Sequence, residues 1–265
     1  MTPFFQKLWN NYQAVTPTAK LVRDSLNLDS YDYFNDHVAF RSLNLKGYGI
    51  DCLIQPFIKE GYKQCGEYYF EEKKLNAVHL ESTTNPLLPK VFISEIILEE
   101  FSTHLQNTLT NSFKHINTNK VSEDILTFGR NWQYAQQIYL DLSKESEYAA
   151  WIYAHGYRVN HFTIRINSLD NTHINSLCKH LIKDDVSLNE SGGIIKGSKQ
   201  VGLRQASTLA DNIKVHCDIS QKTFEIPSCY VEFAERFEVN GKQFNGFVAK
   251  SANHIFDSTN QNKQQ

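Results

Sequence analysis

A segment that occurs twice constrains the fold of this chain more than any other feature. The stretch DHVAFRSLNL at residues 36–45 aligns without gaps to NHFTIRINSL at residues 160–169, so that His161 follows His37 by 124 positions. An apolar pattern of helical spacing follows each copy in the same register. Its members are Ile50, Leu53, Ile54, Phe57 and Ile58 in the first copy and Ile174, Leu177, Cys178, Leu181 and Ile182 in the second. Agreement in both motif and helix phase indicates one structural unit present twice.

Each copy opens with a strand, passes to an amphipathic helix and then enters three segments that are typical of strands. These segments are residues 66–70, 77–81 and 90–97 in the first copy and residues 193–196, 201–209 and 228–237 in the second. Asn85-Pro86 and Gly192-Gly193 supply turns between them. The sequence therefore predicts an α+β fold built from two β-α-β-β-β repeats.

The remaining segments are predicted to form helices that pack around the repeats. An apolar face formed by Phe5, Leu8, Trp9 and Tyr12 predicts an N-terminal helix, and a second helix is expected over residues 18–26. No Pro- or Gly-rich linker divides the chain, which favours one bimodular domain over residues 1–265. Its expected parts are N-terminal helices (1–30), the first repeat (31–98), a helical insertion (99–157), the second repeat (158–250) and a C-terminal tail (251–265).

Composition excludes several classes of protein. Lysine and arginine number 27 against 29 acidic residues, a net charge of −2, so nucleic acid is not expected as a partner. No apolar stretch approaches the ~20 residues of a membrane-spanning helix, and no membrane partner is expected. The five cysteines are odd in number, scattered and never spaced as C-x-x-C, which argues against a disulfide framework and a cysteine zinc site. We therefore expect a protein of a reducing compartment, the cytoplasm.

The two matched histidines predict a metal site. Side chains alternate across a strand, so His37 shares a face with Arg41, and His161 lies on the equivalent face of the second repeat. The last predicted strand places Glu232 on one face and Glu235 on the other. Two histidines and one carboxylate can occupy one face of an octahedral ion and leave positions open for substrate and dioxygen. A single strand histidine is more often a packing residue, but the matched pair with a carboxylate favours a metal.

The motif YVEFAER at residues 230–236 resembles the metal-binding strand of 4-hydroxyphenylpyruvate dioxygenase, with its aromatic-x-Glu-x-x-x-Arg pattern. The paired repeats resemble the vicinal oxygen chelate architecture to which that enzyme belongs. This resemblance implies a half-open barrel around a metal, and it selects Glu232 rather than Glu235 as the carboxylate ligand.

A closer resemblance is to the 2-oxoadipate dioxygenase/decarboxylase family, also called hydroxyglutarate synthases. The similar segments are DHVAFRS (36–42), VNHFT (159–163), YVEFAER (230–236) and GFVA (246–249). The resemblance implies Fe(II) bound by His37, His161 and Glu232. It also implies a substrate carboxylate held by Arg41, with Val248 in a loop that closes over the far end of the substrate.

The implied reaction is the oxidative decarboxylation of 2-oxoadipate by dioxygen to 2-hydroxyglutarate and carbon dioxide, a step of lysine breakdown. His37 is expected to touch the substrate as well as the metal. Gln205 and Ser207 alternate with Leu203 on a predicted strand, and we expect both to line the pocket. Because the chain is shorter than the best-studied members of the family, the chain length of the substrate stays open.

Alternatives remain at this stage. Arg41 can instead form an ion pair with an acid on a neighbouring strand, and its repeat mate Arg165 is expected to be structural. The same architecture also serves isomerases and lyases that use Zn(II), Ni(II) or Mn(II), and binding proteins that hold a ligand without turnover. Dependence on dioxygen separates these classes from the dioxygenase.

Overall fold

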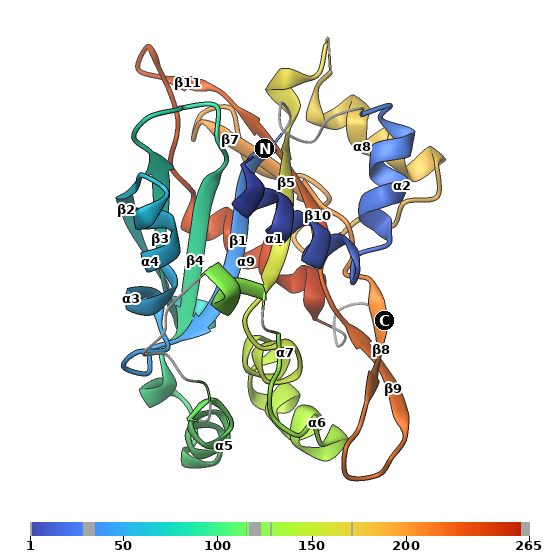
Figure 1. The fold of residues 1–265 in the computed structure, drawn as a ribbon. Coiled ribbons are helices and arrows are strands. Elements are labelled where there is room, and N and C mark those ends of the chain that lie inside the picture. The colour runs from blue at the N-terminus through green and yellow to red at the C-terminus, as the bar shows by residue number, and fades with distance from the viewer. Residues whose placement is uncertain are drawn as a thin grey trace.

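An eight-stranded sheet forms the centre of the molecule, in the order β2-β3-β4-β1-β5-β10-β7-β6 (Figure 1). In this computed structural model the described residues are 2–28, 35–114, 116, 123–127, 129–170 and 172–260. The first repeat supplies β1 (Asn35–Leu43), β2 (Tyr62–Phe70), β3 (Leu75–Ser82) and β4 (Lys90–Ile96). The second supplies β5 (Val159–Arg165), β6 (Lys196–Ser198), β7 (Leu203–Ser207) and β10 (Tyr230–Arg236). The predicted pair of repeats is therefore one continuous, curled sheet.

The two repeats meet at the antiparallel pair β1–β5. His37 lies opposite Thr163, and Ala39 lies opposite His161. Thr163 is the repeat equivalent of Ala39, and His161 is the repeat equivalent of His37. Each histidine therefore lies opposite the equivalent position of the other repeat, and the pairing is the same when the two repeats are exchanged. The outer strands follow the same rule, since β4 runs parallel to β1 and β10 runs parallel to β5. The sheet has a local two-fold relation centred between β1 and β5.

Each repeat places a helix after its first strand, as predicted. The first helix is broken into α3 (Ile50–Leu53) and α4 (Gln55–Lys59), and its counterpart is α8 (Ile174–Lys183). The predicted apolar faces are wrong at their fifth positions, because Ile58 is 43% exposed and Ile182 is 48% exposed. Both isoleucines lie in the last turn, one residue before the helix ends.

The N-terminal helices cover one face of the central strands. In α1 (Pro3–Gln13) the four predicted apolar side chains are buried, and the rings of Trp9 and Tyr12 lie 5.1 Å from the ring of Phe162 on β5. The Thr2 hydroxyl caps this helix by accepting from the amide of Phe5. Helix α2 (Thr18–Ser25) follows. Burial against the sheet, rather than helix propensity, stabilises these short helices.

The described part of the segment between the repeats is helical. Its helices are η2 (Leu98–Glu100), α5 (Thr103–Phe113), η4 (Glu123–Thr127), α6 (Gln136–Glu145) and α7 (Glu147–His155). Helices α5, α6 and α7 lie at one end of the sheet (Figure 1), whereas η4 contacts α1. Residues 148–155 of α7 are all buried, so this helix is enclosed by the fold. Short 3-10 turns follow β2 and β5 at η1 (Glu71–Lys73) and η5 (Ile166–Ser168).

The second repeat departs from the predicted pattern in two places. A hairpin of β8 (Asn212–His216) and β9 (Thr223–Pro227) separates β7 from β10, and nothing in the sequence pattern had indicated it. The strand expected over residues 193–196 begins only at Lys196. Gly192 and Gly193 both have positive φ and form the turn that delays it.

The C-terminal segment is part of the barrel, whereas the sequence predicts only a tail from residue 251. After a small hairpin, β11 (Glu238–Val239) with β12 (Lys242–Gln243), come α9 (Ala249–Phe256) and η6 (Asp257–Thr259). Helix α9 contacts β2, β6 and β7, and it lies on the side of the sheet opposite to α1 (Figure 1). The reason is apolar burial, since the side chains of Ile255 and Phe256 are at most 5% exposed. None of the described helices is long and apolar enough to cross a membrane.

Candidate metal centre

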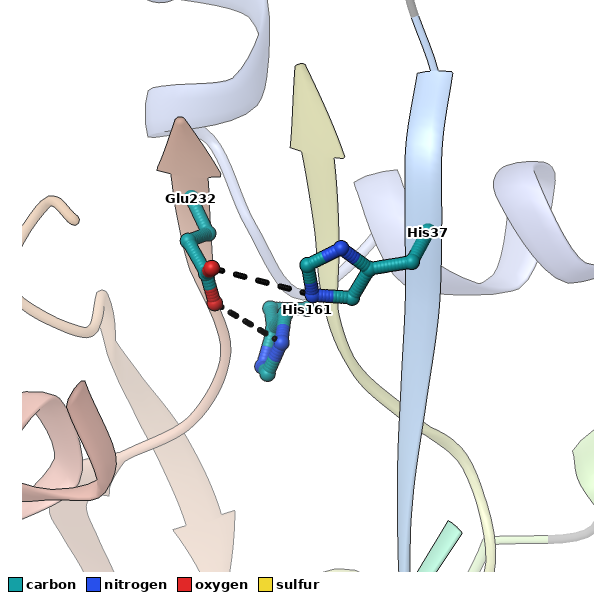
Figure 2. A group of neighbouring side chains, drawn as sticks. All are labelled: His37, His161 and Glu232. Carbon is teal, nitrogen blue, oxygen red and sulfur yellow. Dashed lines mark ion pairs between the residues drawn. The ribbon is translucent and has the colours of Figure 1, made fainter. Parts of the chain in front are cut away.

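Three side chains from three adjacent strands converge inside the curled sheet. His37 comes from β1, His161 from β5 and Glu232 from β10, and Figure 2 shows them pointing toward one another. The Nε2 atom of His161 lies 3.0 Å from Oε2 of Glu232, and Nε2 of His37 lies 3.7 Å from Oε1. All three residues are buried, and their ligand atoms lie within 4.8 Å of one another. The structure thus brings together the three residues that the sequence selected.

The outer nitrogen of each histidine is already occupied. Nδ1 of His37 lies 2.8 Å from Oδ1 of Asp36, and Nδ1 of His161 lies 3.0 Å from Oδ1 of Asn160. Asp36 and Asn160 are repeat equivalents. With Nδ1–H donating outward, each ring presents the Nε2 lone pair to the centre, which is how metal-binding histidines are usually oriented. The Oγ1 of Thr163 lies 3.0 Å from Nε2 of His37.

Arg236 fixes the carboxylate behind His37. Its Nε and Nη2 donate to the two oxygens of Asp36, each at 2.8 Å, and its Nη1 donates to the carbonyl of Gly246. Burial alone would raise the pKa of Asp36, but the Arg236 guanidinium holds that pKa well below its usual range. Asp36 is therefore an anion beside His37, whereas Asn160 beside His161 is neutral.

Electrostatics favour a cation at the centre. Burial would raise the pKa of Glu232, but the two facing histidines outweigh it and hold that pKa far below its usual range. For His37, burial would lower the pKa, but the charges of Glu232 and Asp36 outweigh burial and raise it. For His161, burial outweighs the charge of Glu232, and the pKa is lowered. A buried carboxylate between two imidazole lone pairs is a donor set for a divalent metal of the Mn-to-Zn series.

Only one of the two half-barrels carries the carboxylate. Thr163 pairs with Glu232 on β10, and the repeat equivalent of Thr163, Ala39, pairs with Phe92 on β4. Phe92 therefore takes the position of Glu232 in the first repeat. This difference gives the two-fold sheet one candidate metal centre, to which both repeats contribute.

Gln205 and Ser207 lie on the same face of the sheet as Glu232. Nε2 of Gln205 donates to Oε1 of Glu232 at 2.5 Å, and its own Oε1 is buried with no partner among the described residues. Ser207 pairs with Glu232 across the sheet, and its hydroxyl lies 2.8 Å from that of Ser258. The ring of Tyr230 stacks on His161 at 4.7 Å, and its buried hydroxyl also finds no partner there. Orphaned polar atoms beside the centre indicate a polar ligand.

Arg41 is buried in an ion pair. Its Nη1 lies 2.7 Å from Oε1 of Glu147 on α7, and its Nη2 donates to Oγ1 of Thr259 at 2.9 Å. The guanidinium also lies over the rings of Tyr148 and Trp151. The sequence predicts an ion pair as the alternative role of Arg41, but its expected place for the acid, a neighbouring strand, is wrong, because Glu147 lies on helix α7. Its Nε remains without a partner among the described residues.

The loop that contains Val248 covers the centre. The ring of Phe247 meets that of His37 edge-on at 4.8 Å, and its amide donates to the hydroxyl of Tyr68. Val248 is half-buried and is the N-cap residue of α9. Sequence reasoning missed Phe247, Asp36 and Asn160, although the last two precede the histidines at matched positions of the repeat.

Two β-α-β-β-β repeats around a shared His-His-Glu centre define a protein of the vicinal oxygen chelate class. The fold agrees, since a glyoxalase superfamily protein from Ralstonia eutropha JMP134 superposes with a TM-score of 0.73 at 17% identity over 92% of this chain and 84% of that one. This chain belongs to the 2-oxoadipate dioxygenase/decarboxylase family, whose model matches residues 5–129 and 117–245. It is thereby an enzyme of the dioxygenase/decarboxylase type.

Individual relatives agree. A curated chloroplastic/amyloplastic 2-oxoadipate dioxygenase/decarboxylase from Oryza sativa subsp. japonica is 35% identical, over 97% of this chain and 79% of its own. The structure of the hydroxyglutarate synthase from Oryza sativa in complex with 2-oxoadipate matches with a TM-score of 0.90 and 31% identity. That match covers 98% of this chain and 92% of that one.

His37 is held by a charged side chain and His161 by a neutral one, and this difference leads to a prediction about metal binding. Asp36→Asn removes a charged hydrogen bond behind His37, and we expect it to weaken metal binding by about 10–100-fold. Asn160→Ala removes only a neutral hydrogen bond behind His161 and should cost less. Competition with a chelator measures both dissociation constants, and urea unfolding of the metal-free variants reports any loss of stability separately. An Asp36→Asn protein that binds metal as tightly as the wild type would contradict the assignment.

Proposed function

We propose that this protein is an Fe(II)-dependent enzyme that converts 2-oxoadipate and dioxygen to 2-hydroxyglutarate and carbon dioxide. The observation that carries the proposal is the buried Glu232 carboxylate facing two imidazole lone pairs, in a chain whose relatives are named for this reaction. The atoms balance: C1 leaves as carbon dioxide, C2 becomes a carboxylate, C3 gains a hydroxyl, and both oxygen atoms of dioxygen end in the products.

His37, His161 and Glu232 are the residues that would hold the iron. When bound there, Fe(II) supplies the redox chemistry with dioxygen and, with three protein ligands on one face, leaves up to three positions for the other reactants. Gln205 keeps the Glu232 carboxylate in place through its 2.5 Å hydrogen bond. The two outer partners, Asp36 and Asn160, keep both rings turned so that Nε2 faces inward.

The orphaned polar atoms suit the substrate and the product. The Tyr230 hydroxyl and the Arg41 Nε are buried donors, and either can donate to a carboxylate or a keto oxygen. The Gln205 Oε1 is an acceptor, so it can receive the hydroxyl hydrogen that only the product carries. We assign Arg41 to a substrate carboxylate and Gln205 and Ser207 to the pocket wall, with His37 in contact with substrate as well as metal.

Phe247 and Val248 would keep water out of this pocket. The Phe247 ring covers His37, and all three ligand residues are at most 4% exposed. A dry site strengthens the pairing of a substrate carboxylate with Arg41, since the local dielectric constant is low. We place Val248 over the far end of the bound substrate.

The setting we propose is the breakdown of lysine in the cytoplasm. Five free cysteines, four of them buried, suit a reducing compartment. The alternatives are an isomerase or lyase of the same architecture with Zn(II), Ni(II) or Mn(II), and a binding protein without turnover. Both lack a need for dioxygen.

Stoichiometry tests the reaction class. With Fe(II) and 2-oxoadipate, we expect oxygen uptake and carbon dioxide release in equal amounts, because C1 is lost once for each dioxygen consumed. An oxygen electrode and a carbon dioxide assay run in parallel measure both. Turnover under strict anaerobiosis would instead show an isomerase or lyase.

Removal of one ligand tests the centre. His161→Ala should abolish turnover and leave iron retention much weaker, while the circular dichroism spectrum is unchanged, because the ring contributes a metal ligand more than core volume. His216→Ala is the matched control, since its side chain is exposed on the β8–β9 hairpin, away from the sheet. Full iron content and activity in His161→Ala would refute the triad.

Arg41→Met tests the carboxylate contact. Losing one charged contact to a buried carboxylate costs about 2–5 kcal/mol. We therefore expect kcat/KM to fall roughly 30-fold or more, at tenfold per ~1.4 kcal/mol, with iron binding retained. Arg41→Lys should recover only part, since an ammonium lacks the planar fork.

Glu147→Gln is the comparison that isolates the ion pair. It removes the carboxylate partner and leaves the guanidinium in place. We expect it to keep most of the activity that Arg41→Met loses. Equal losses of kcat/KM in the two variants would assign Arg41 to the ion pair alone.

A further inference from the structure

One buried cation of the barrel lacks a carboxylate partner. Among the described residues, four lysine or arginine side chains are buried. They are Arg41, Lys90, Lys196 and Arg236. Arg41 pairs with Glu147 at 2.7 Å, Lys90 with Glu81 at 3.3 Å and Arg236 with Asp36 at 2.8 Å. No described carboxylate lies within ion-pair distance of Lys196, which is 3% exposed.

The ammonium of Lys196 also has one donor to spare. Its Nζ donates to the main-chain carbonyls of Asn189 at 2.6 Å and of Ile194 at 3.3 Å. An ammonium carries three N–H donors, so one has no partner among the described residues. Burial lowers the pKa of Lys196 to about 8, which still leaves it mostly protonated at neutral pH. A buried charge without a counter-ion is costly, and an anionic ligand would remove that cost.

The sheet register places Lys196 on the face that carries the metal centre. Lys196 lies opposite Gln205 on β7, and Gln205 donates to Glu232 on β10. Lys196 is level with Ala234 on β10, two residues from Glu232. Two strand spacings of ~4.8 Å and a two-residue offset of ~6.6 Å put the backbones of Lys196 and Glu232 about 12 Å apart. A six-carbon dicarboxylate with its keto end at the candidate metal centre can reach a lysine side chain over that distance.

The two halves of the barrel differ in a way that directs the substrate toward Lys196. The first half is filled by aromatic rings, with Phe247 lying 4.8 Å from Phe92 and 5.9 Å from Tyr68. The second half carries the polar side chains of Gln205 and Ser207 on the face of the metal centre. An anionic chain that extends from the centre into the second half meets the side chains of Gln205 and Ser207.

We propose that Lys196 binds the distal carboxylate of a dicarboxylic 2-oxo acid and so selects dicarboxylic over monocarboxylic substrates. This inference rests on the proposed function for the keto end of the substrate. Arg41, at the α7 end of the site, contacts the carboxylate next to the keto group, and Lys196 supplies the charge for the other one.

The test compares two substrates of equal chain length, 2-oxoadipate and 2-oxohexanoate, with the iron-loaded enzyme. Lys196→Met should lower kcat/KM for 2-oxoadipate by about 30-fold or more and leave that for 2-oxohexanoate within about threefold. Lys196→Arg should restore part of the preference. Lys199→Met is the matched control, since that lysine is exposed three residues further on, and its preference should equal that of the wild type.

Equal losses on both substrates in Lys196→Met would overturn the proposal, because a lysine that only ties the 189–194 turn would not distinguish them. If Lys196→Met does not fold, inhibition of the wild type decides: adipate should compete at least tenfold better than hexanoate, and equal inhibition would overturn the proposal.

Calorimetric binding of adipate keeps this inference separate from the proposed function. If the wild type turns over no 2-oxo acid, the reaction assignment fails, yet adipate should still bind the wild type and bind Lys196→Met at least tenfold more weakly. Equal adipate affinity in the wild type and in Lys196→Met would contradict the Lys196 assignment even if 2-oxoadipate is turned over.

Discussion

The antiparallel pairing of β1 with β5 is the interaction on which the rest of the structure depends. It sets His37 opposite Thr163 and Ala39 opposite His161, so the two histidines lie diagonally across a single strand pair. Because side chains alternate, a slip of one residue in either strand would turn that strand's histidine to the helix-covered face, where Phe162 packs against α1. The apolar face therefore fixes the register that builds the centre.

Departures from the two-fold symmetry make this sheet an active site. The first half has Phe92 where the second has Glu232, and the first has Asp36 where the second has Asn160. One carboxylate suffices for a centre that both histidines share, and the remaining half is free to be filled by aromatic rings. Arg236 joins the halves, since it follows Glu232 on β10 yet pairs with Asp36 beside His37. Strand β10 thus carries Glu232 and also Arg236, which holds Asp36 behind His37 and donates to the carbonyl of Gly246 in the loop that covers the centre.

Local patterns in the sequence were sufficient to predict the repeats, their first strands and the two matched histidines, whereas Glu232 was selected over Glu235 by the resemblance of its strand to a known metal-binding strand. Strand alternation and a fixed offset of 124 positions determine which side chains share a face, and neither depends on distant parts of the chain. The role of Asp36 and Asn160 lay within reach of the same argument, because each precedes a ligand histidine.

The features that the sequence did not predict depend on contacts between segments that are distant in the chain. Glu147 belongs to the insertion and lies 106 positions from Arg41, so no local pattern connects them. That none of the described carboxylates pairs with Lys196 is likewise visible only in three dimensions. The C-terminal helix did leave a signal, since Ala252, Ile255 and Phe256 have helical spacing and are buried. The β8–β9 hairpin left none that we can identify.

The location of iron in crystals of the Fe(II)-loaded protein, found by anomalous diffraction at the iron edge, tests the central claim most directly. The account predicts one peak, bounded by Nε2 of His37, Nε2 of His161 and the carboxylate of Glu232. Among the described residues one other cluster has ligand atoms as close together, formed by Cys65, His79 and Glu81. A peak at that cluster, with none between the two matched histidines, would contradict the account.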